Sequence, residues 1–391
     1  MSNDQTLQNV NDNSEQLTST KQPSTSPGDG NSSIGRRSFM KRLGLAGAAA
    51  LPVGALLTSQ TRASAEDRDH GTRLNAGDAA IIRFLAAIEI LETDLWQQYN
   101  ELALGNAAFQ QGLITLDGDM PTYVNQNTRD EFSHQNFLNA YLVSKSRKAV
   151  SLEPFRKLPS SQATGSNKTA KRLTNLMNLN VDTSWFLRYR LAGNPDFGDT
   201  FAQIVNLQNV PGIPNQDLPL PSDLTNGFQA QFIANVAGFH FATVEQGGSS
   251  LYTSFLTKAS SLEVLRIVGS IGGTETMHFQ TWSDKAGNAP SLMDSHNNVI
   301  FPELPHAPDP TPDGIDHSDP TDTNQIMPAP CKFISASLPL CSIIRPTSTQ
   351  QAGAMATVAF FTTMGLFQGQ SPGFFDFIAS LAEEADAARR D

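Results

Sequence analysis

Glutamate residues lie in the middle of otherwise apolar helical stripes in this chain, and this pattern limits the possible folds more than any other feature. From Asp78 to Leu104 apolar side chains recur at spacings of three and four, which is typical of the core-facing side of a helix. Glu92 lies on that side, between Ile88 and Leu95. A buried carboxylate is costly unless a cation or a hydrogen-bond donor compensates it. The stripe therefore predicts a helix whose buried face carries a carboxylate that binds a cation or accepts a hydrogen bond.

A second predicted helix, from Thr128 to about Lys148, places an acidic and an imidazole side chain on one face. Glu131 and His134 are three residues apart, so they project together from the helix. Thr128 precedes Glu131 by three residues, which leaves a second interpretation open: Glu131 is then only the partner of a capping box at the helix start. The rest of the chain favours the first interpretation.

The third and fourth predicted helices repeat this arrangement. Residues 224–258 form an apolar stripe that Glu245 interrupts, and a fourth helix, expected from Ser260 onward, carries Glu275 and His278 three residues apart. With only seven histidines in the chain, about 0.2 Glu-x-x-His pairs are expected by chance. Because two such pairs occur, each in phase with its stripe and each after a core-face glutamate, the pattern is an internal repeat.

The chemistry that requires such a repeat is a dinuclear metal site between four helices. In such sites two helices each give one Glu, and the other two each give a Glu-x-x-His pair. Four carboxylates balance two divalent cations, and two imidazoles complete a ligand field that suits iron or manganese. The predicted metal ligands are Glu92, Glu131, His134, Glu245, Glu275 and His278, with Glu131 and Glu275 expected to bridge the two ions.

Several choices stay open. Glu89 lies one turn before Glu92 beside the same stripe, so either residue could be the ligand from the first helix, and we favour Glu92. The ligand set suits iron and manganese alike. Tyr99 and Tyr252 each follow a core-face glutamate by seven residues and are interpreted as core aromatic residues that hydrogen-bond a ligand carboxylate.

Together these motifs resemble those of the ferritin-like di-metal carboxylate superfamily, which includes ferritins, rubrerythrins and manganese catalases. The resemblance covers residues 76–148 and 224–286 and matches six ligand positions. It implies a mainly α chain with a ferritin-like four-helix bundle over residues 76–286, interrupted by an insertion at 150–223 whose fold the sequence does not predict. A Pro-rich loop and C-terminal helices over 287–391 are expected to pack on the bundle. The branch resembled most is that of exported ferritin-like proteins related to plant desiccation-related proteins.

Residues 1–65 have the composition of a disordered N-terminus followed by an export signal. Their first part contains few large apolar side chains. Arg36 and Arg37 precede a short apolar run, residues 43–57, and a small-residue sequence at 63–65, an order that resembles a twin-arginine signal. We therefore expect export by the twin-arginine machinery to the periplasm or the extracellular space. A membrane anchor is the weaker interpretation, because the run is short and rich in Ala and Gly.

Composition limits the partners further. A net charge of −11 and a pI near 5.1 argue against a nucleic-acid partner, which requires a basic face. Outside the N-terminus no window contains the roughly 18 uncharged apolar residues of a stable membrane span.

Cys331 and Cys341 are expected to form a local disulfide if the compartment is oxidising. A homodimer is common in the resembled superfamily, but the sequence itself leaves the oligomeric state open.

The ligand set and the resemblance imply redox chemistry with dioxygen or peroxide, either ferroxidase-like or peroxide-consuming, in envelope stress protection. The first alternative is a manganese catalase, with hydrogen peroxide as its sole substrate. The second is a non-enzymatic metal-binding protein of desiccation or stress tolerance. Iron storage in a hollow shell is disfavoured, because the long insertions would obstruct shell packing.

Overall fold

The structure is a computed structural model of the chain. It describes residues 74–183, 207–218, 224–290, 292–294, 299–301, 330–331, 335, 337–339, 341–342 and 353–390. The chain divides into two units, Met1–Asp69 and His70–Asp391, and all described residues belong to the second. The expected export signal and most of the Pro-rich loop lie outside the described residues.

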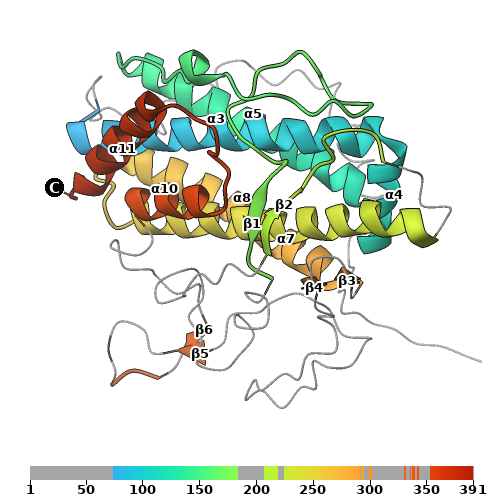
Figure 1. Cartoon of the computed structure of the whole chain (residues 1–391). Helices are drawn as coiled ribbons and strands as arrows, with labels where there is room; N and C mark the ends of the chain where they lie inside the picture. Colours follow the sequence, from blue (N-terminus) through green and yellow to red (C-terminus); the bar gives the residue numbers. More distant parts are fainter. Residues whose placement is uncertain are drawn as a thin grey trace, which may run out of the picture. The chain divides into compact units, whose positions relative to one another are not determined.

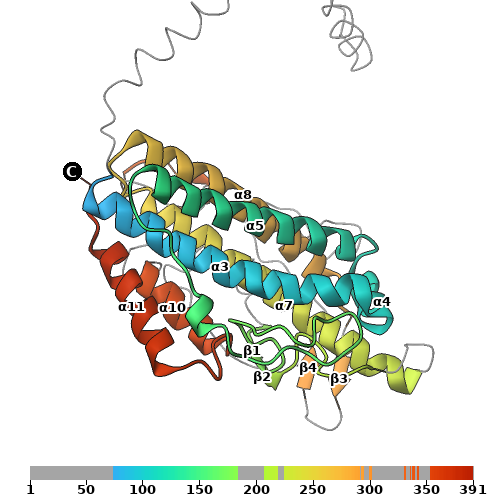
Figure 2. The same ribbon diagram turned by 90° about the horizontal axis from the view of Figure 1, so that it is seen from above.

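The described residues are mainly helical, which confirms the mainly α prediction. Their α-helices are α3 (Ala76–Gly105), α4 (Ala107–Leu116), α5 (Met120–Ser144), α7 (Leu224–Phe255), α8 (Leu262–Gly287), α10 (Ala354–Thr363) and α11 (Pro372–Ala387), with a short 3₁₀ turn at Glu153–Phe155. The long helices α3, α5, α7 and α8 run along a common direction, with α3 packed along α5 and α7 along α8 (Figures 1 and 2). None of the described helices is both long enough and apolar enough to cross a bilayer.

Short antiparallel strand pairs lie outside these helices. They are β1 (Leu179–Val181) with β2 (Leu207–Val210), β3 (Leu292–Asp294) with β4 (Val299–Phe301), and β5 (Pro330–Cys331) with β6 (Cys341–Ser342). The register of the last pair places Cys331 opposite Cys341. The disulfide between these two cysteines stays a prediction.

The start of α5 differs from the sequence prediction. The helix begins at Met120, well before Thr128, and Thr128 lies inside it with its hydroxyl donating to the Val124 carbonyl at 2.7 Å. The capping-box interpretation of Glu131 is therefore wrong, because Glu131 is not in a first turn. The polar run from Asn125 to Asn127 concealed these turns, since polar side chains interrupt the apolar stripe by which a helix is recognised.

Helix α8 is fixed to the start of α3 by a buried carboxylate. Its N-cap is Ser261, one residue later than the start expected at Ser260, and the Ser261 hydroxyl accepts from the Val264 N–H at 3.2 Å. The backbone N–H groups of Ser260 and Ser261 donate to the two oxygens of Asp78, at 2.8 and 2.9 Å. Asp78 is buried, and these N–H donors give each of its two carboxylate oxygens a hydrogen bond.

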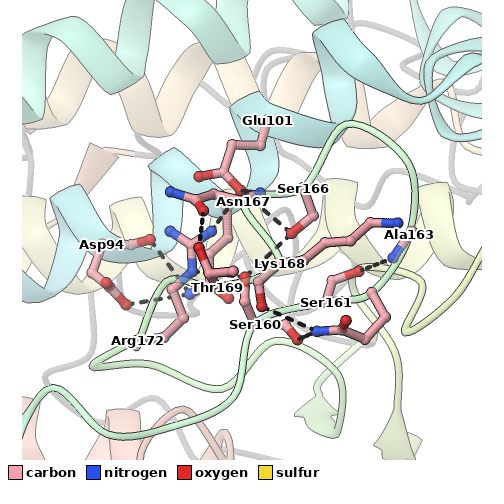
Figure 3. A network of polar contacts seen from close by, with 12 residues as sticks. Asp94, Glu101, Ser160, Ser161, Ala163, Ser166, Asn167, Lys168, Thr169 and Arg172 are labelled. Atoms are coloured by element: carbon pink, nitrogen blue, oxygen red, sulfur yellow. Dashed lines mark hydrogen bonds and ion pairs between the residues drawn. The ribbon is translucent and has the colours of Figure 1, made fainter.

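A second buried carboxylate, Asp94, fixes the irregular segment that follows α5 against α3 (Figure 3). Asp94 Oδ2 accepts from the backbone N–H groups of Leu173 and Thr174, both at 2.9 Å, and from the Thr174 hydroxyl at 2.7 Å. Asp94 Oδ1 pairs with the Arg156 guanidinium. Nearby, Arg172 pairs with Glu101 near the end of α3. These contacts explain how a segment with little secondary structure is held in one conformation.

Replacement of Asp94 by Ala should therefore destabilise the fold strongly. The change leaves the buried N–H donors of Leu173 and Thr174 without their acceptor and removes the buried partner of Arg156, which costs about 3–5 kcal/mol. Glu153→Ala is the matched control, because Glu153 pairs with the same Arg156 but its side chain is 68% exposed. The control should stay within about 0.5 kcal/mol of the parent. Denaturant unfolding measures both, and equal effects of the two changes would contradict this role of Asp94.

Tyr99 and His240 form a buried polar pair between α3 and α7. The Tyr99 hydroxyl and His240 Nδ1 share a hydrogen bond of 2.8 Å, and both side chains are buried. Tyr99 thus contacts a histidine and not a ligand carboxylate, contrary to the prediction for this residue. Burial lowers the pKa of His240 to about 3, so the imidazole is neutral in the folded chain.

This lowered pKa predicts a specific loss of stability in acid. Between the unfolded pKa of about 6.5 and the folded value, the unfolded chain binds the extra proton, so His240 destabilises the fold by up to about 1.4 kcal/mol per pH unit as the pH falls. In His240→Gln this contribution is absent. The difference in unfolding free energy between parent and variant should therefore shift in favour of the variant from pH 6.5 downward. A difference that stays constant from pH 7 to pH 4 would contradict the assignment.

Candidate metal centre

Carboxylates and imidazoles from four helices meet at one level of the helix arrangement. Helix α3 gives two carboxylates, α5 a Glu-His pair, α7 one carboxylate and α8 a second Glu-His pair, and all are buried: Glu89, Glu92, Glu131, His134, Glu245, Glu275 and His278. The structure thus brings all six predicted ligands into one region together with Glu89. The Glu-x-x-His spacing aligns each pair on one helix face, because residues three apart are neighbours on the helix surface.

Two overlapping groups of donor atoms form within this region. In each group one donor atom of every side chain lies within 4.8 Å of the others. The first group consists of Glu89, Glu131, His134 and Glu275, and the second of Glu131, Glu245, Glu275 and His278. Glu131 and Glu275 belong to both groups. This is the arrangement expected of two carboxylates that bridge a pair of cations.

The first group is centred on the Nδ1 atom of His134. This nitrogen lies 3.1 Å from Glu131 Oε2 and 3.3 Å from Glu275 Oε1. It lies 3.4 Å from Glu89 Oε2. The other Glu89 oxygen, Oε1, accepts a hydrogen bond from the Tyr252 hydroxyl of α7. Tyr252 therefore contacts a carboxylate of the candidate site, although this carboxylate is Glu89 and not the predicted ligand Glu92.

The second group is centred on the Nδ1 atom of His278. This nitrogen lies 3.1 Å from Glu131 Oε1 and 3.4 Å from Glu245 Oε2. The other ring nitrogen, Nε2, lies 3.1 Å from Asp130 Oδ2. A carboxylate on the second nitrogen is the usual device that orients a ligating imidazole. Asp130 was not singled out in the sequence, although it directly precedes Glu131.

Many carboxylate oxygens and one imidazole nitrogen in the region make no hydrogen bond to the described residues. They are Oε2 of Glu89, both carboxylate oxygens of Glu92, Oε2 of Glu245, both carboxylate oxygens of Glu275, and Nδ1 of His278. Glu89 Oε2, Glu275 Oε1 and Glu245 Oε2 each lie 3.3–3.4 Å from a histidine Nδ1, whereas both Glu92 oxygens and Glu275 Oε2 have no ion pair among the described residues. Buried polar atoms are almost always paired in native proteins, and an unpaired buried charge is more costly still. Because these atoms converge and are of the oxygen and nitrogen types that iron and manganese accept, the residues fit a metal pair.

The pKa values of these side chains also indicate a site for cations. Burial, opposed by the bonds to His134, raises the pKa of Glu89 to about 7. Burial and the neighbouring carboxylates raise the pKa of Glu92 well above its usual range, and burial does the same for Glu245. Burial alone would lower the pKa of His134, but its carboxylate partners raise it. Without metal the region thus retains protons that two cations would displace.

Two glycines, Gly248 of α7 and Gly272 of α8, lie where these helices pack closely beside the candidate site. A Cβ on Gly248 would lie 2.7 Å from Glu275 Oε2, and a Cβ on Gly272 would lie 2.7 Å from the Tyr252 Cβ. Both distances are shorter than real Cβ atoms show. At Gly272 the neighbour is the Tyr252 Cβ, so glycine is required there for α7 and α8 to approach this closely, whereas at Gly248 a side chain would displace the end of Glu275. For Gly247 and Gly248 beside Glu245, the sequence allows two reasons, close helix approach or access to the metals, and favours access. At Gly248 the structure shows close packing against Glu275.

The structure places Glu89, and not Glu92, within the two groups of donor atoms. The repeat is then Glu89-x6-Trp96 on α3 and Glu245-x6-Tyr252 on α7, which aligns Trp96 with Tyr252 in place of Tyr99. Glu92 faces the same region from one turn further along, with burial and four surrounding carboxylates acting on its pKa. The sequence pattern could not separate the two glutamates, because α3 is buried around most of its circumference.

Asn127 is a further residue of the centre that sequence reasoning missed. Its Nδ2 donates to Glu131 Oε1 at 2.7 Å and to Glu245 Oε1 at 3.0 Å. Its Oδ1 accepts from Trp282 Nε1 at 2.8 Å. Asn127 lies one turn before Glu131 on α5, so helical spacing was the available signal once the helix start was placed correctly.

Comparisons with models of protein families, with curated proteins and with solved structures found no match for this chain.

The geometry predicts unequal roles for the two α3 glutamates. Glu89→Gln should lower the metal content per chain, because Glu89 supplies an oxygen to the first donor group. Glu92→Gln, which removes a carboxylate of equal burial from the same helix, should leave the metal content unchanged. Elemental analysis after equilibration with ferrous or manganous ions measures both. Loss of metal in Glu92→Gln with full content in Glu89→Gln would instead establish Glu92 as the ligand.

Proposed function

We propose that this chain is an exported, ferritin-like protein whose four-helix bundle holds a dinuclear iron or manganese centre that reacts with dioxygen or peroxide. The observation that carries the proposal is the set of buried carboxylate and imidazole atoms that converge without hydrogen-bond partners among the described residues. Two helices that give a Glu and two that give a Glu-x-x-His pair are the pattern of di-metal carboxylate bundles.

Charge balance supports two divalent ions. The carboxylates of the two donor groups, Glu89, Glu131, Glu245 and Glu275, would neutralise two such cations, while His134 and His278 would each give one neutral nitrogen. When bound, iron or manganese supplies the electrons that reduce dioxygen or peroxide.

The protein's own residues would hold and shield this pair. Asp130 orients the His278 ring so that Nδ1 faces the carboxylates, and the Tyr252 hydroxyl restrains Glu89. Glu92, with its raised pKa, retains a proton at a carboxyl group that faces the ligands. Such a proton is suited to a reaction in which an oxidant is reduced and takes up protons.

The direct test replaces both bridging glutamates. Glu131→Ala with Glu275→Ala should abolish metal binding and with it the consumption of peroxide or dioxygen. The matched control is Glu383→Ala with Glu384→Ala, which removes the same charge from the exposed side of α11. Circular dichroism checks that both proteins fold. A parent chain that binds neither ion after reconstitution with each would contradict the proposal.

The same samples separate the three candidate reactions. Rapid peroxide disproportionation by the manganese form without an added reductant would indicate a manganese catalase. Oxidation of ferrous iron, or peroxide consumption that requires a reductant, would indicate the redox role proposed here. A metal-loaded chain that does neither would be a non-enzymatic metal-binding protein of stress tolerance.

A further inference from the structure

Two tryptophans stack in the core beside the metal ligands. Trp96 of α3 and Trp282 of α8 have ring centroids 5.3 Å apart and planes inclined by 21°. Trp282 Nε1 donates to Asn127, whose amide donates in turn to Glu131 and Glu245. One amide side chain therefore links the Trp282 indole to two carboxylates of the centre.

The aromatic contacts continue from Trp282 to the surface. The Tyr123 ring lies 6.4 Å from the Trp282 ring in an edge-on arrangement, and Tyr123 is 37% exposed. Tyr123, Asn127 and Trp282 line a pocket of about 140 Å³ that also contacts Asp130 and His278. This volume corresponds to roughly five water molecules and is enough for a small organic molecule. A molecule in the pocket would touch an oxidisable ring and a metal ligand at once.

The chemistry of these side chains suits electron transfer. Indole and phenol are the aromatic side chains that lose one electron most readily, whereas Phe would pack as well but would not take part. The Lys285 ammonium lies 4.5 Å from the Tyr123 ring centroid. Its positive charge disfavours a cationic tyrosine, so oxidation of Tyr123 must release the phenolic proton as well. Tyr123 is thus suited to exchange an electron and a proton together with a donor in the pocket.

We propose that Tyr123, Trp282 and Asn127 form a path that carries electrons from a small hydroquinone-type donor in this pocket to the metal pair. The inference rests on the proposed function, because only an oxidant reduced at the centre draws the electrons. It assigns the chain a second substrate, the reductant, and a binding site for it.

Reduction of one hydrogen peroxide to two water molecules requires two electrons and two protons. Each electron passes from Trp282 to the metal pair and is replaced from Tyr123, which releases its phenolic proton to water. The oxidised Tyr123 then takes one hydrogen atom from an O–H bond of the donor. Two such steps convert one hydroquinone to quinone, so hydroquinone and peroxide give quinone and two waters.

The test uses the full, metal-loaded chain, hydrogen peroxide and 1,4-hydroquinone. Tyr123→Phe and Trp282→Phe should each slow quinone formation roughly tenfold or more, with metal content unchanged. Tyr141→Phe is the matched control, because Tyr141 lies on the same helix but bonds Glu263 outside this path, and its rate should equal that of the parent. Tyr123 is partly exposed, so its variant keeps the test valid even if Trp282→Phe folds poorly.

Electron paramagnetic resonance supplies a readout independent of turnover. Peroxide without hydroquinone should produce a tyrosyl radical in the parent and in Tyr141→Phe, and this signal should be lost in Tyr123→Phe. Fully metal-loaded variants that form quinone at the parent rate would overturn the path while leaving the metal proposal intact. A parent chain that consumes no peroxide would overturn both, and its equal inactivity across all variants distinguishes that failure.

Discussion

The structure depends on how the charge of the carboxylates buried between α3, α5, α7 and α8 is compensated. At one level each of these helices presents acidic side chains to the others, in a medium where like charges repel strongly and few donors are available. A side chain at position 248 of α7 would collide with the Glu275 carboxylate, so glycine there leaves space for this acid. Helix packing therefore depends on a cation pair or on retained protons.

Other buried carboxylates of the same fold, in contrast, have hydrogen-bond donors. Asp78 receives backbone N–H groups from the start of α8, and Asp94 receives backbone, hydroxyl and guanidinium donors. The fold thus satisfies its structural carboxylates fully. Glu92 has no hydrogen-bond donor among the residues described, and Glu275 has only the His134 Nδ1 atom, 3.3 Å from its Oε1. Asp78 and Asp94 thus have donors for their charge, whereas Glu92 and Glu275 largely do not. This difference is what we expect if Glu92 and Glu275 face a bound cation.

The surrounding segments support this arrangement from outside. The irregular segment after α5 is held on α3 by Asp94 and Arg172, and α11 packs on α3 from another side. Asp386 of α11 accepts from backbone N–H groups at the start of α10 and from Lys258, three residues after the end of α7. Helix α3 is thereby enclosed, which keeps water from the carboxylates that it contributes.

Much of this could be predicted from the sequence, because the helical period and the Glu-x-x-His spacing are local. Glu131, His134, Glu275 and His278 follow from these patterns alone. The choice between Glu89 and Glu92 did not follow, because an enclosed helix has no polar side to fix its rotation. Asn127 and Asp130 were missed because their roles arise from contacts across helices. The segment at 150–183 gave no periodic signal, since side chains such as Asp94 and Arg172 determine its conformation.

The most direct test of the central claim is X-ray anomalous scattering from crystals of the chain loaded with iron or manganese, measured above and below each absorption edge. The account predicts two adjacent peaks between Glu131 and Glu275, one beside His134 and the other beside His278. Crystals that show no peak there, with the carboxylates protonated and bonded to one another, would contradict the account and leave a helical protein whose buried acids serve its structure alone.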